Sequence, residues 1–152
     1  MQIIHPIALG KWPKSFLKEA QFTATRSKDP STKVGAIVVN QKKRIVSTGY
    51  NGPPQGCHDQ EMTRDKKLLR TLHAELNCVL FASQPLDDCT IFVTAPTCAQ
   101  CMAAIIQVGI TTVYALAAEK EFEGRWLESC VEAQIMAEEA GVEYYQVLQE
   151  SK

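Results

Sequence analysis

Two short runs of chemically reactive residues stand out in the sequence: His73-Ala74-Glu75 and Cys98-Ala-Gln-Cys101. The two cysteines lie three positions apart on the first turn of a predicted helix, where free backbone N–H groups and the helix dipole favour thiolates. Thiolates in that position attract a cation, and His73 is the natural third ligand. Two thiolates and one imidazole leave one position of a tetrahedral zinc ion open, which is typical of catalytic zinc. The sequence therefore predicts a catalytic Zn²⁺ site.

Glu75 distinguishes His73 from the other two histidines, His5 and His58. Its place two residues after His73 puts a carboxylate beside the open position without making it a ligand. Zinc lowers the pKa of a bound water towards ~7, and a nearby carboxylate can pass that proton to a ring nitrogen and a departing amine. We therefore predict hydrolytic deamination, with Glu75 as the proton shuttle.

Each run has a simpler explanation when it is taken singly. A lone CxxC is more often a structural zinc or redox motif, and a histidine at a helix start is more often a cap or a core residue. In combination, however, His-x-Glu at one helix start and CxxC at the next form the zinc-deaminase motif. The combination favours the catalytic interpretation.

The motif departs from its usual form at one position. The usual motif has proline directly before the first cysteine, whereas here Thr97 stands in that place and Pro96 is one residue earlier. We predict that Thr97 is the N-cap of the helix that carries the cysteines. A changed loop path past the base would alter fine substrate preference rather than the reaction.

An alternation of strands and helices must position these residues. Apolar residues recur at helical spacing in several segments, and runs rich in β-branched residues lie between them. In chain order we predict a helix over 13–27, a hairpin of strands 34–39 and 44–50, a turn-rich loop over 51–56, a polar segment over 57–70, a helix over 73–83, a strand over 90–94, a helix over 98–109, a strand over 111–116, a helix over 121–140 and a strand over 142–147.

Helical crossovers between strands imply an α/β fold, with a mixed sheet of about five strands covered by helices. Binding sites in such sheets lie where strands feed helix starts, and His73 and Cys98 both lie at predicted helix starts. A chain of 152 residues with 45% hydrophobic residues can bury one core, so we expect a single domain over 1–152.

Charge and segment composition exclude several classes of partner. The net charge is −1 and the 16 lysines and arginines form no cluster, so we expect no polynucleotide partner. The first residues lack the pattern of a signal peptide and no stretch reaches membrane-spanning length, so we expect a cytoplasmic protein without membrane contact. In a reducing compartment the six cysteines stay unpaired, and we treat Cys57, Cys78, Cys89 and Cys130 as non-ligands.

Five segments resemble the deoxycytidylate (dCMP) deaminases: RSKDPSTKVGA (26–36), GYNG (49–52), GC (56–57), HAELN (73–77) and IIQVGI (105–110). The match runs from about residue 14 to residue 147. It implies a cytidine-deaminase-like three-layer α/β/α fold and the zinc-dependent conversion of dCMP to dUMP and ammonia, which feeds thymidylate synthesis. Many members of that family are homohexamers activated by dCTP and inhibited by dTTP. The resemblance thus implies a homo-oligomer, hexamer or trimer, with these nucleotides as effectors.

The resemblance also assigns residues by matching motif. It implies that His73, Cys98 and Cys101 bind zinc, that Glu75 shuttles protons, that Asn51 reaches the sugar, that Ala74 contacts the substrate, and that Arg26 and Lys28 are candidates for the phosphate. Basic residues at a helix end and Asn-Gly in a turn also have purely structural explanations. Arg125 and Trp126 could approach the nucleotide, but we predict a surface arginine and a core tryptophan. Cys57-His58 leaves a second, structural zinc open, although no complementary cluster is evident.

Three other functions stay open at this point. The first keeps the chemistry but changes the substrate to 5-methyl- or 5-hydroxymethyl-dCMP, because Thr97 alters the loop beside the base. The second is deamination of a base within RNA or DNA, which the mild acidity of the chain disfavours. The third is a catalytically inactive zinc-folded binding module, which leaves the presence of Glu75 without an explanation.

Overall fold

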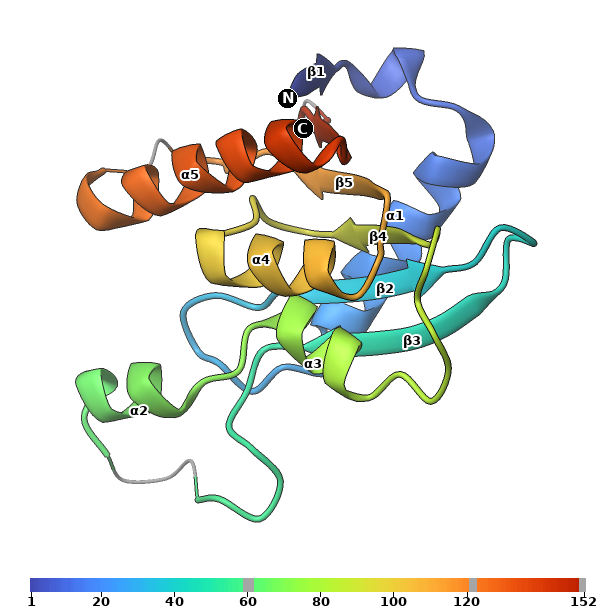
Figure 1. Ribbon diagram of the computed structural model, residues 1–152. Coiled ribbons are helices and arrows are strands. Elements are labelled where there is room, and N and C mark those ends of the chain that lie inside the picture. The colour runs from blue at the N-terminus through green and yellow to red at the C-terminus, as the bar shows by residue number, and fades with distance from the viewer. Residues whose placement is uncertain (59–61, 121–122, 151–152) are drawn as a thin grey trace.

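The computed structural model describes residues 1–58, 62–120 and 123–150. Figure 1 shows a twisted sheet with helices on both of its faces. The elements are β1 (Gln2–Ile4), a 3-10 turn η1 (Pro6–Ala8), α1 (Lys11–Ala24), β2 (Gly35–Val39), β3 (Ile45–Tyr50), α2 (Arg64–Arg70), α3 (Ala74–Leu80), β4 (Thr90–Val93), α4 (Ala99–Gln107), β5 (Thr112–Leu116), α5 (Gly124–Ala140) and β6 (Glu143–Val147).

The sheet is mixed, with the strand order β1-β6-β5-β4-β2-β3. β4, β5, β6 and β1 run parallel to one another, β2 is antiparallel to β4, and β3 is antiparallel to β2. Within the described residues the sheet has six strands rather than the five or so that the sequence predicts. The missed strand is β1, which has only three residues and leaves Ile3 exposed, so it carries no alternating apolar pattern. β1 is recognised as a strand only by its parallel pairing with β6.

The helices form two layers, with α3, α4 and α5 on one face of the sheet and α1 on the other (Figure 1). Glycines allow the closest approach on each face. A Cβ atom on Gly49 would lie 2.5 Å from both Ala74 O and Cys78 N of α3, and one on Gly35 would overlap the main chain of α1 at Ala20. α3, which begins directly after His73, therefore rests on β3 itself. No helix in residues 1–58, 62–120 and 123–150 combines the length and apolar character needed to cross a membrane.

The core is divided between the two faces. On the α1 face, aromatic rings form a row across three neighbouring strands, with centroid distances of 5.3 Å from Phe16 to Phe92, 5.1 Å on to Tyr114 and 4.9 Å on to Tyr145. The core of the opposite face includes the fully buried Cys78, Met102, Ile105 and Val113. Both faces bury apolar side chains, and the face covered by α3, α4 and α5 also buries thiols, among them Cys78 and Cys89.

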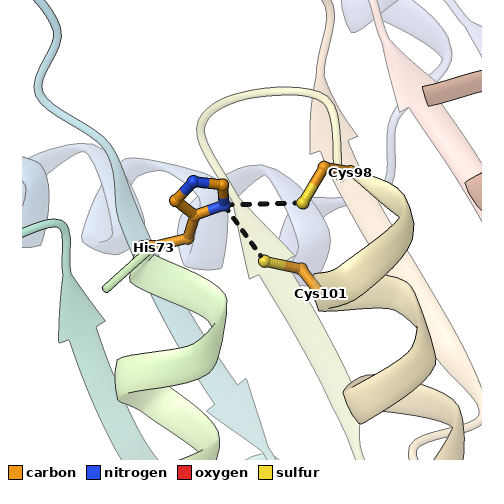
Figure 2. A group of neighbouring side chains, drawn as sticks. All are labelled: His73, Cys98 and Cys101. Carbon is orange, nitrogen blue, oxygen red and sulfur yellow. Dashed lines mark hydrogen bonds between the residues drawn. The ribbon is translucent and has the colours of Figure 1, made fainter. Parts of the chain in front are cut away.

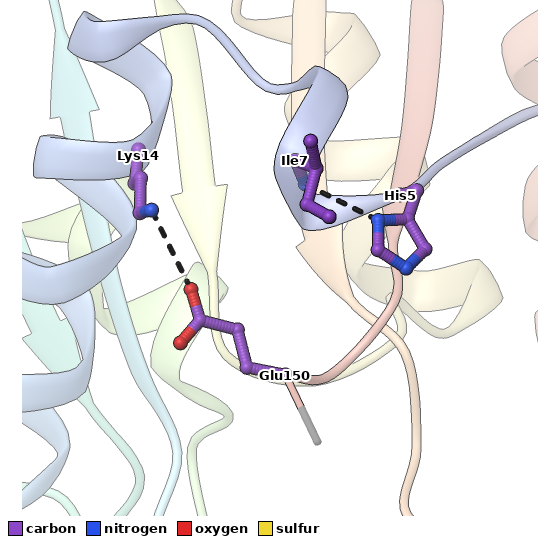
Figure 3. Close-up of polar contacts among 4 residues, drawn as sticks. All are labelled: His5, Ile7, Lys14 and Glu150. Atoms are coloured by element: carbon purple, nitrogen blue, oxygen red, sulfur yellow. Dashed lines mark hydrogen bonds and ion pairs between the residues drawn. The ribbon is translucent and has the colours of Figure 1, made fainter.

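The ends of the described chain lie close together. β1 and β6 are paired, and the Leu148 N–H donates to Ile4 O. The Lys14 amine lies 3.7 Å from the Glu150 carboxylate, and the Nδ1 atom of His5 accepts the N–H of Ile7 (Figure 3). The ion pair is exposed and contributes little stability. The His5 bond caps η1, which gives that histidine a local structural role.

Most predicted elements are present with shifted ends. The hairpin is confirmed as β2 and β3, and the helices over 13–27, 73–83 and 98–109 are found as the shorter α1, α3 and α4. The segment over 57–70, which the sequence identifies only as polar, contains α2, whose N-cap Thr63 accepts the Lys66 N–H. The predicted start of the last helix at 121 lies outside the described residues, and α5 is described from Gly124.

Candidate active site

The two reactive runs lie at the starts of adjacent helices. His73 is the N-cap of α3 and Cys98 is the N-cap of α4, and both have extended backbones. Leu72, the residue before His73, exchanges two main-chain hydrogen bonds with Gly52, at 2.8 and 3.1 Å. This bridge holds the entry to α3, and with it the His73 main chain, against the loop that follows β3.

Three potential metal ligands converge at this point. The His73 Nδ1 atom lies 3.4 Å from Cys98 Sγ and 3.3 Å from Cys101 Sγ, and Figure 2 shows the imidazole pointing between the two sulfurs. Zinc with Zn–S of about 2.3 Å and Zn–N of about 2.0 Å at tetrahedral angles would place nitrogen and sulfur roughly 3.5 Å apart. All three ligand atoms lie within 4.8 Å of one another. The donor set and its spacing therefore fit zinc.

Burial and mutual hydrogen bonding shift the ionisation of the site. Hydrogen bonding to the Cys101 thiol and to His73 lowers the pKa of Cys98 to about 4, against the opposing effect of burial. The hydrogen bond with Cys98 in turn raises the pKa of His73. Cys98 is thus poised as a thiolate, the form that binds a metal.

Glu75 lies on the first turn of α3, two residues after His73, and is only 4% exposed. Burial raises the pKa of its carboxyl to about 7, against the lowering effects of backbone hydrogen bonding and His73. The negative charge of Cys98 also raises this pKa and a hydrogen bond with Cys101 lowers it, so the carboxyl belongs to the same site. It is not a member of the group of three ligands. This is the separation of roles that the sequence predicts.

The prediction that Thr97 caps α4 is wrong. The helix begins at Ala99, so the N-cap falls on Cys98 and the Thr97 side chain is one residue too early to cap it. Thr97 is fully buried instead, and its backbone N–H donates to the hydroxyl of Tyr144 on β6 at 3.1 Å. A proline would have no N–H to donate. Tyr144 therefore accepts the backbone donor that threonine adds in place of proline, whereas the buried Thr97 hydroxyl has no hydrogen-bond partner among the described residues.

α5 is attached to the metal-binding turn by a hydrogen bond. The Ala99 N–H, between the two ligand cysteines, donates to Ser129 Oγ at 2.9 Å. One turn earlier on α5, the Trp126 ring lies 5.9 Å from the His73 ring, centroid to centroid, in an edge-to-face arrangement. Trp126 is 37% exposed, so the prediction of a core tryptophan is wrong, whereas Arg125 is exposed as predicted. The i, i+3 spacing of Trp126 and Ser129 could have indicated a shared helix face.

The predicted sugar and phosphate contacts lie in a neighbouring groove. Arg26, Lys28 and Asn51 line a groove of about 800 Å³ that extends to Leu72, next to His73. The three metal ligands are not among its lining residues.

Asn51 is 8% exposed, and its amide accepts the Val34 N–H and donates to Thr32 O, at 2.9 and 2.8 Å. Here it braces the loop before β2. Lys67 and Arg70 of α2, which the sequence did not single out, line a smaller pocket with Lys28.

The described residues give no support to a second, structural zinc at Cys57 and His58. Cys57 and His58 are exposed, and among the residues that the structure describes they belong to no group of three metal-ligating side chains.

Comparison with known proteins agrees with this geometry. Residues 10–117 match the model of the cytidine and deoxycytidylate deaminase zinc-binding region. The chain belongs to this deaminase family. An uncharacterized deaminase in the luxG 3′ region of Aliivibrio fischeri is 46% identical over 137 residues, which cover 89% of this chain and 92% of that protein. The deoxycytidylate deaminase of Homo sapiens is 39% identical over 112 residues, 68% of this chain and 63% of that protein.

Solved structures show the same fold. The apo dCMP deaminase of the cyanophage S-TIM5 has a TM-score of 0.72 and 26% identity, over 91% of this chain and 98% of its own. The same phage enzyme in complex with dCMP and dUMP has a TM-score of 0.71 and 29% identity, over 88% of this chain and 94% of its own. The predicted cytidine-deaminase-like α/β fold is therefore confirmed, and zinc is the cofactor that both the family and the ligand cluster indicate.

Proposed function

We propose that this protein catalyses the hydrolytic deamination of dCMP to dUMP and ammonia. The observation that carries the proposal is the convergence of His73, Cys98 and Cys101 with the buried carboxyl of Glu75 at two adjacent helix starts. Family membership supports the reaction class. The human relative named deoxycytidylate deaminase and the phage structure with dCMP and dUMP support the substrate.

The chemistry divides between the metal and Glu75. His73, Cys98 and Cys101 would hold zinc, which supplies Lewis-acid activation of water near neutral pH. Glu75 takes one proton of the attacking water and delivers it to N3 of cytosine, and then carries the second proton to N4. The C4–O bond forms and the C4–N4 bond breaks, so that ammonia leaves and dUMP remains. Burial favours this role because it keeps bulk water from competing for the proton.

Contacts with the rest of the nucleotide are part of the proposal. Arg26 and Lys28 supply cations to the phosphate, from the groove that they share with Asn51. For Asn51 to reach the sugar, its amide must give up one of its bonds to Thr32 or Val34. Ala74 is fully buried, so its proposed contact with the substrate requires a neighbouring side chain to move.

The test compares related nucleotides on zinc-loaded protein. Ammonia release and the ultraviolet change are followed with dCMP, CMP, deoxycytidine and 5-methyl-dCMP, using wild type and Glu75→Gln. We expect turnover of dCMP, lowered by about 10²–10⁴-fold in Glu75→Gln, with the same zinc content in both proteins. Preference for 5-methyl-dCMP in direct competition would shift the assignment to the modified nucleotide. Turnover of an oligonucleotide but not of dCMP would refute the proposal.

Regulation and assembly extend the same proposal. By resemblance to the dCMP deaminases, we propose a cytoplasmic homohexamer or homotrimer that supplies dUMP for thymidylate synthesis, activated by dCTP and inhibited by dTTP. Initial rates with each triphosphate test the regulation, and light scattering of the zinc-loaded protein tests the assembly. Rates unaffected by either triphosphate would remove the effectors, and a monomer in solution would remove the oligomer.

A further inference from the structure

Phe22 is a large apolar side chain that the core does not use. It lies on the last turn of α1 and is 66% exposed, whereas Phe16 of the same helix is 6% exposed. The guanidinium carbon of Arg26, four residues later, lies over the Phe22 ring, 5.4 Å from its centroid. At that distance the negative face of an aromatic ring attracts a cation. Phe22 therefore contacts a cation that lines the groove beside the metal site.

The main chain around Arg26 is held in place as well. The Arg26 N–H donates to Thr23 O at 3.1 Å, which continues the helical path beyond the end of α1. The next residue, Ser27, is 2% exposed, and its hydroxyl donates to Asn51 O at 2.8 Å. The loop that carries Asn51 thus fixes the backbone at Arg26, and Phe22 holds the far end of the arginine side chain.

This contact leaves the guanidinium able to bind an anion. Among the described residues, the one ion pair joins Lys14 to Glu150, so Arg26 has no carboxylate partner there. A cation–π contact uses the charge of a guanidinium and does not consume its N–H donors. A side chain that is already in place also loses less conformational entropy when it binds. An arginine held in this way binds a phosphate more tightly than a freely moving one.

We propose that Phe22 is a positioning residue, which holds the Arg26 guanidinium at the groove where it receives the phosphate of the nucleotide. The inference rests on the proposed function, because it takes a nucleoside monophosphate as the substrate and Arg26 as a phosphate ligand. Phe22 touches no substrate, and its effect on binding passes through Arg26. Binding of a nucleoside without a phosphate is therefore independent of Phe22.

The experiment compares dCMP with deoxycytidine, which lacks the phosphate. KM, kcat and zinc content are measured for wild type, Phe22→Leu, Phe22→Tyr, Arg26→Gln and the double variant Phe22→Leu/Arg26→Gln. Where deoxycytidine turns over too slowly, its inhibition constant against dCMP replaces KM. Trp12→Leu is the matched control, because Trp12 lies on the same helix and contacts a cation, Lys43 at 4.8 Å, that does not line the groove.

We expect Phe22→Leu to raise KM for dCMP about two- to fivefold, the loss of an exposed cation–π contact, with kcat and zinc content unchanged. Phe22→Tyr keeps the aromatic ring and should keep the wild-type KM. Arg26→Gln should raise KM by roughly 10–100-fold, and Phe22→Leu should add nothing in that background. Binding of deoxycytidine should be the same in all variants, and Trp12→Leu should behave as wild type.

Three results would overturn the inference while the proposed function stands. An unchanged KM for dCMP in Phe22→Leu would show that the ring does not place the guanidinium. The same increase in the presence and in the absence of the Arg26 side chain would show that Phe22 does not act through it. An equal loss of affinity for deoxycytidine would show a general effect on the fold. If wild type fails to turn over dCMP, the proposed function is wrong and the inference falls with it.

Discussion

On one face of the sheet α1 packs onto β2 at Gly35, and on the other face α3 packs onto β3 at Gly49. In both places a Cβ atom would meet helix main chain. The absence of a side chain on glycine therefore lets a helix contact a strand directly on each face. The α1 face then packs Phe16, Ile37 and Phe92 into a hydrophobic core whose described members include no cysteine. The opposite face holds the reactive groups of the site.

The difference lies in where helices begin. α3 and α4 start side by side at one end of the sheet, so their N-caps His73 and Cys98 meet there (Figure 2). α1 starts at Lys11 after Gly10, a cap that brings no side chain. Close packing of a helix on a sheet is thus common to both faces, and the chemistry arises from two helix starts placed together.

The largest effect should come from removing a zinc ligand. Cys98→Ser should abolish zinc binding and turnover, because two donors do not retain the metal. Hydrogen exchange should speed up at the starts of α3 and α4 while α1 and β2 stay protected. Cys57→Ser, at an exposed thiol outside the cluster, is the matched control and should keep both zinc and activity. Equal loss of protection in α1 would mean that the two faces are not independent.

Alanine substitutions at Gly35 and Gly49 should distinguish the effect of helix–strand packing on stability from its effect on zinc binding. Gly49→Ala and Gly35→Ala should each lower the free energy of unfolding by about 2–3 kcal/mol, since the added methyl group overpacks against helix backbone. Gly49→Ala should also weaken zinc binding, because α3 carries His73, whereas Gly35→Ala should not. Denaturant titration gives the stability, and a competing chelator gives zinc affinity per folded chain. Unchanged zinc affinity in Gly49→Ala would contradict the expected coupling.

A smaller loss of stability is expected when the Tyr144 hydroxyl, which accepts the Thr97 N–H, is removed. Tyr144→Phe should cost about 1–3 kcal/mol, because it leaves a buried donor without its partner. Tyr145→Phe is the control: its hydroxyl donates to Glu143 at the surface, so its loss should cost less than about 0.5 kcal/mol. Thermal or denaturant unfolding of the two variants measures the difference. Equal costs would show that the Thr97 bond adds nothing.

The stability advantage of wild type over Tyr144→Phe should shrink at high pH. Burial raises the pKa of Tyr144 to about 12; the bond to Thr97 opposes this, and Cys130 and Glu75 add to it. Because the raised pKa favours the neutral phenol in the folded state, the stabilisation is complete below about pH 10, the value for unfolded tyrosine, and is lost as the pH rises towards 12.

At pH 11, one unit above the unfolded pKa, the advantage should be smaller by about 1.4 kcal/mol. Urea titrations of both proteins at pH 8 and pH 11 measure this change. A difference that stays constant between the two pH values would show that the phenol ionises as easily in the folded state as in the unfolded one.

Local rules were enough to predict the residues of the metal site. The spacing of Cys98 and Cys101, and of His73 and Glu75, places each pair on one helix turn whatever the rest of the chain does. The polar residues between two β-branched runs likewise predicted the β2–β3 hairpin, because turn chemistry acts over a few residues.

Contacts between distant elements needed the tertiary structure. β1 exists through its pairing with β6, Tyr144 faces Thr97 across the core, and Ser129 and Trp126 reach the metal site from α5. A shift of one residue at the start of α4 was enough to make Thr97 a buried residue instead of a cap. Residue types and spacing therefore determined which side chains can do the chemistry. Long-range pairing and packing, whose free energy depends on partners far along the chain, decided what surrounds them.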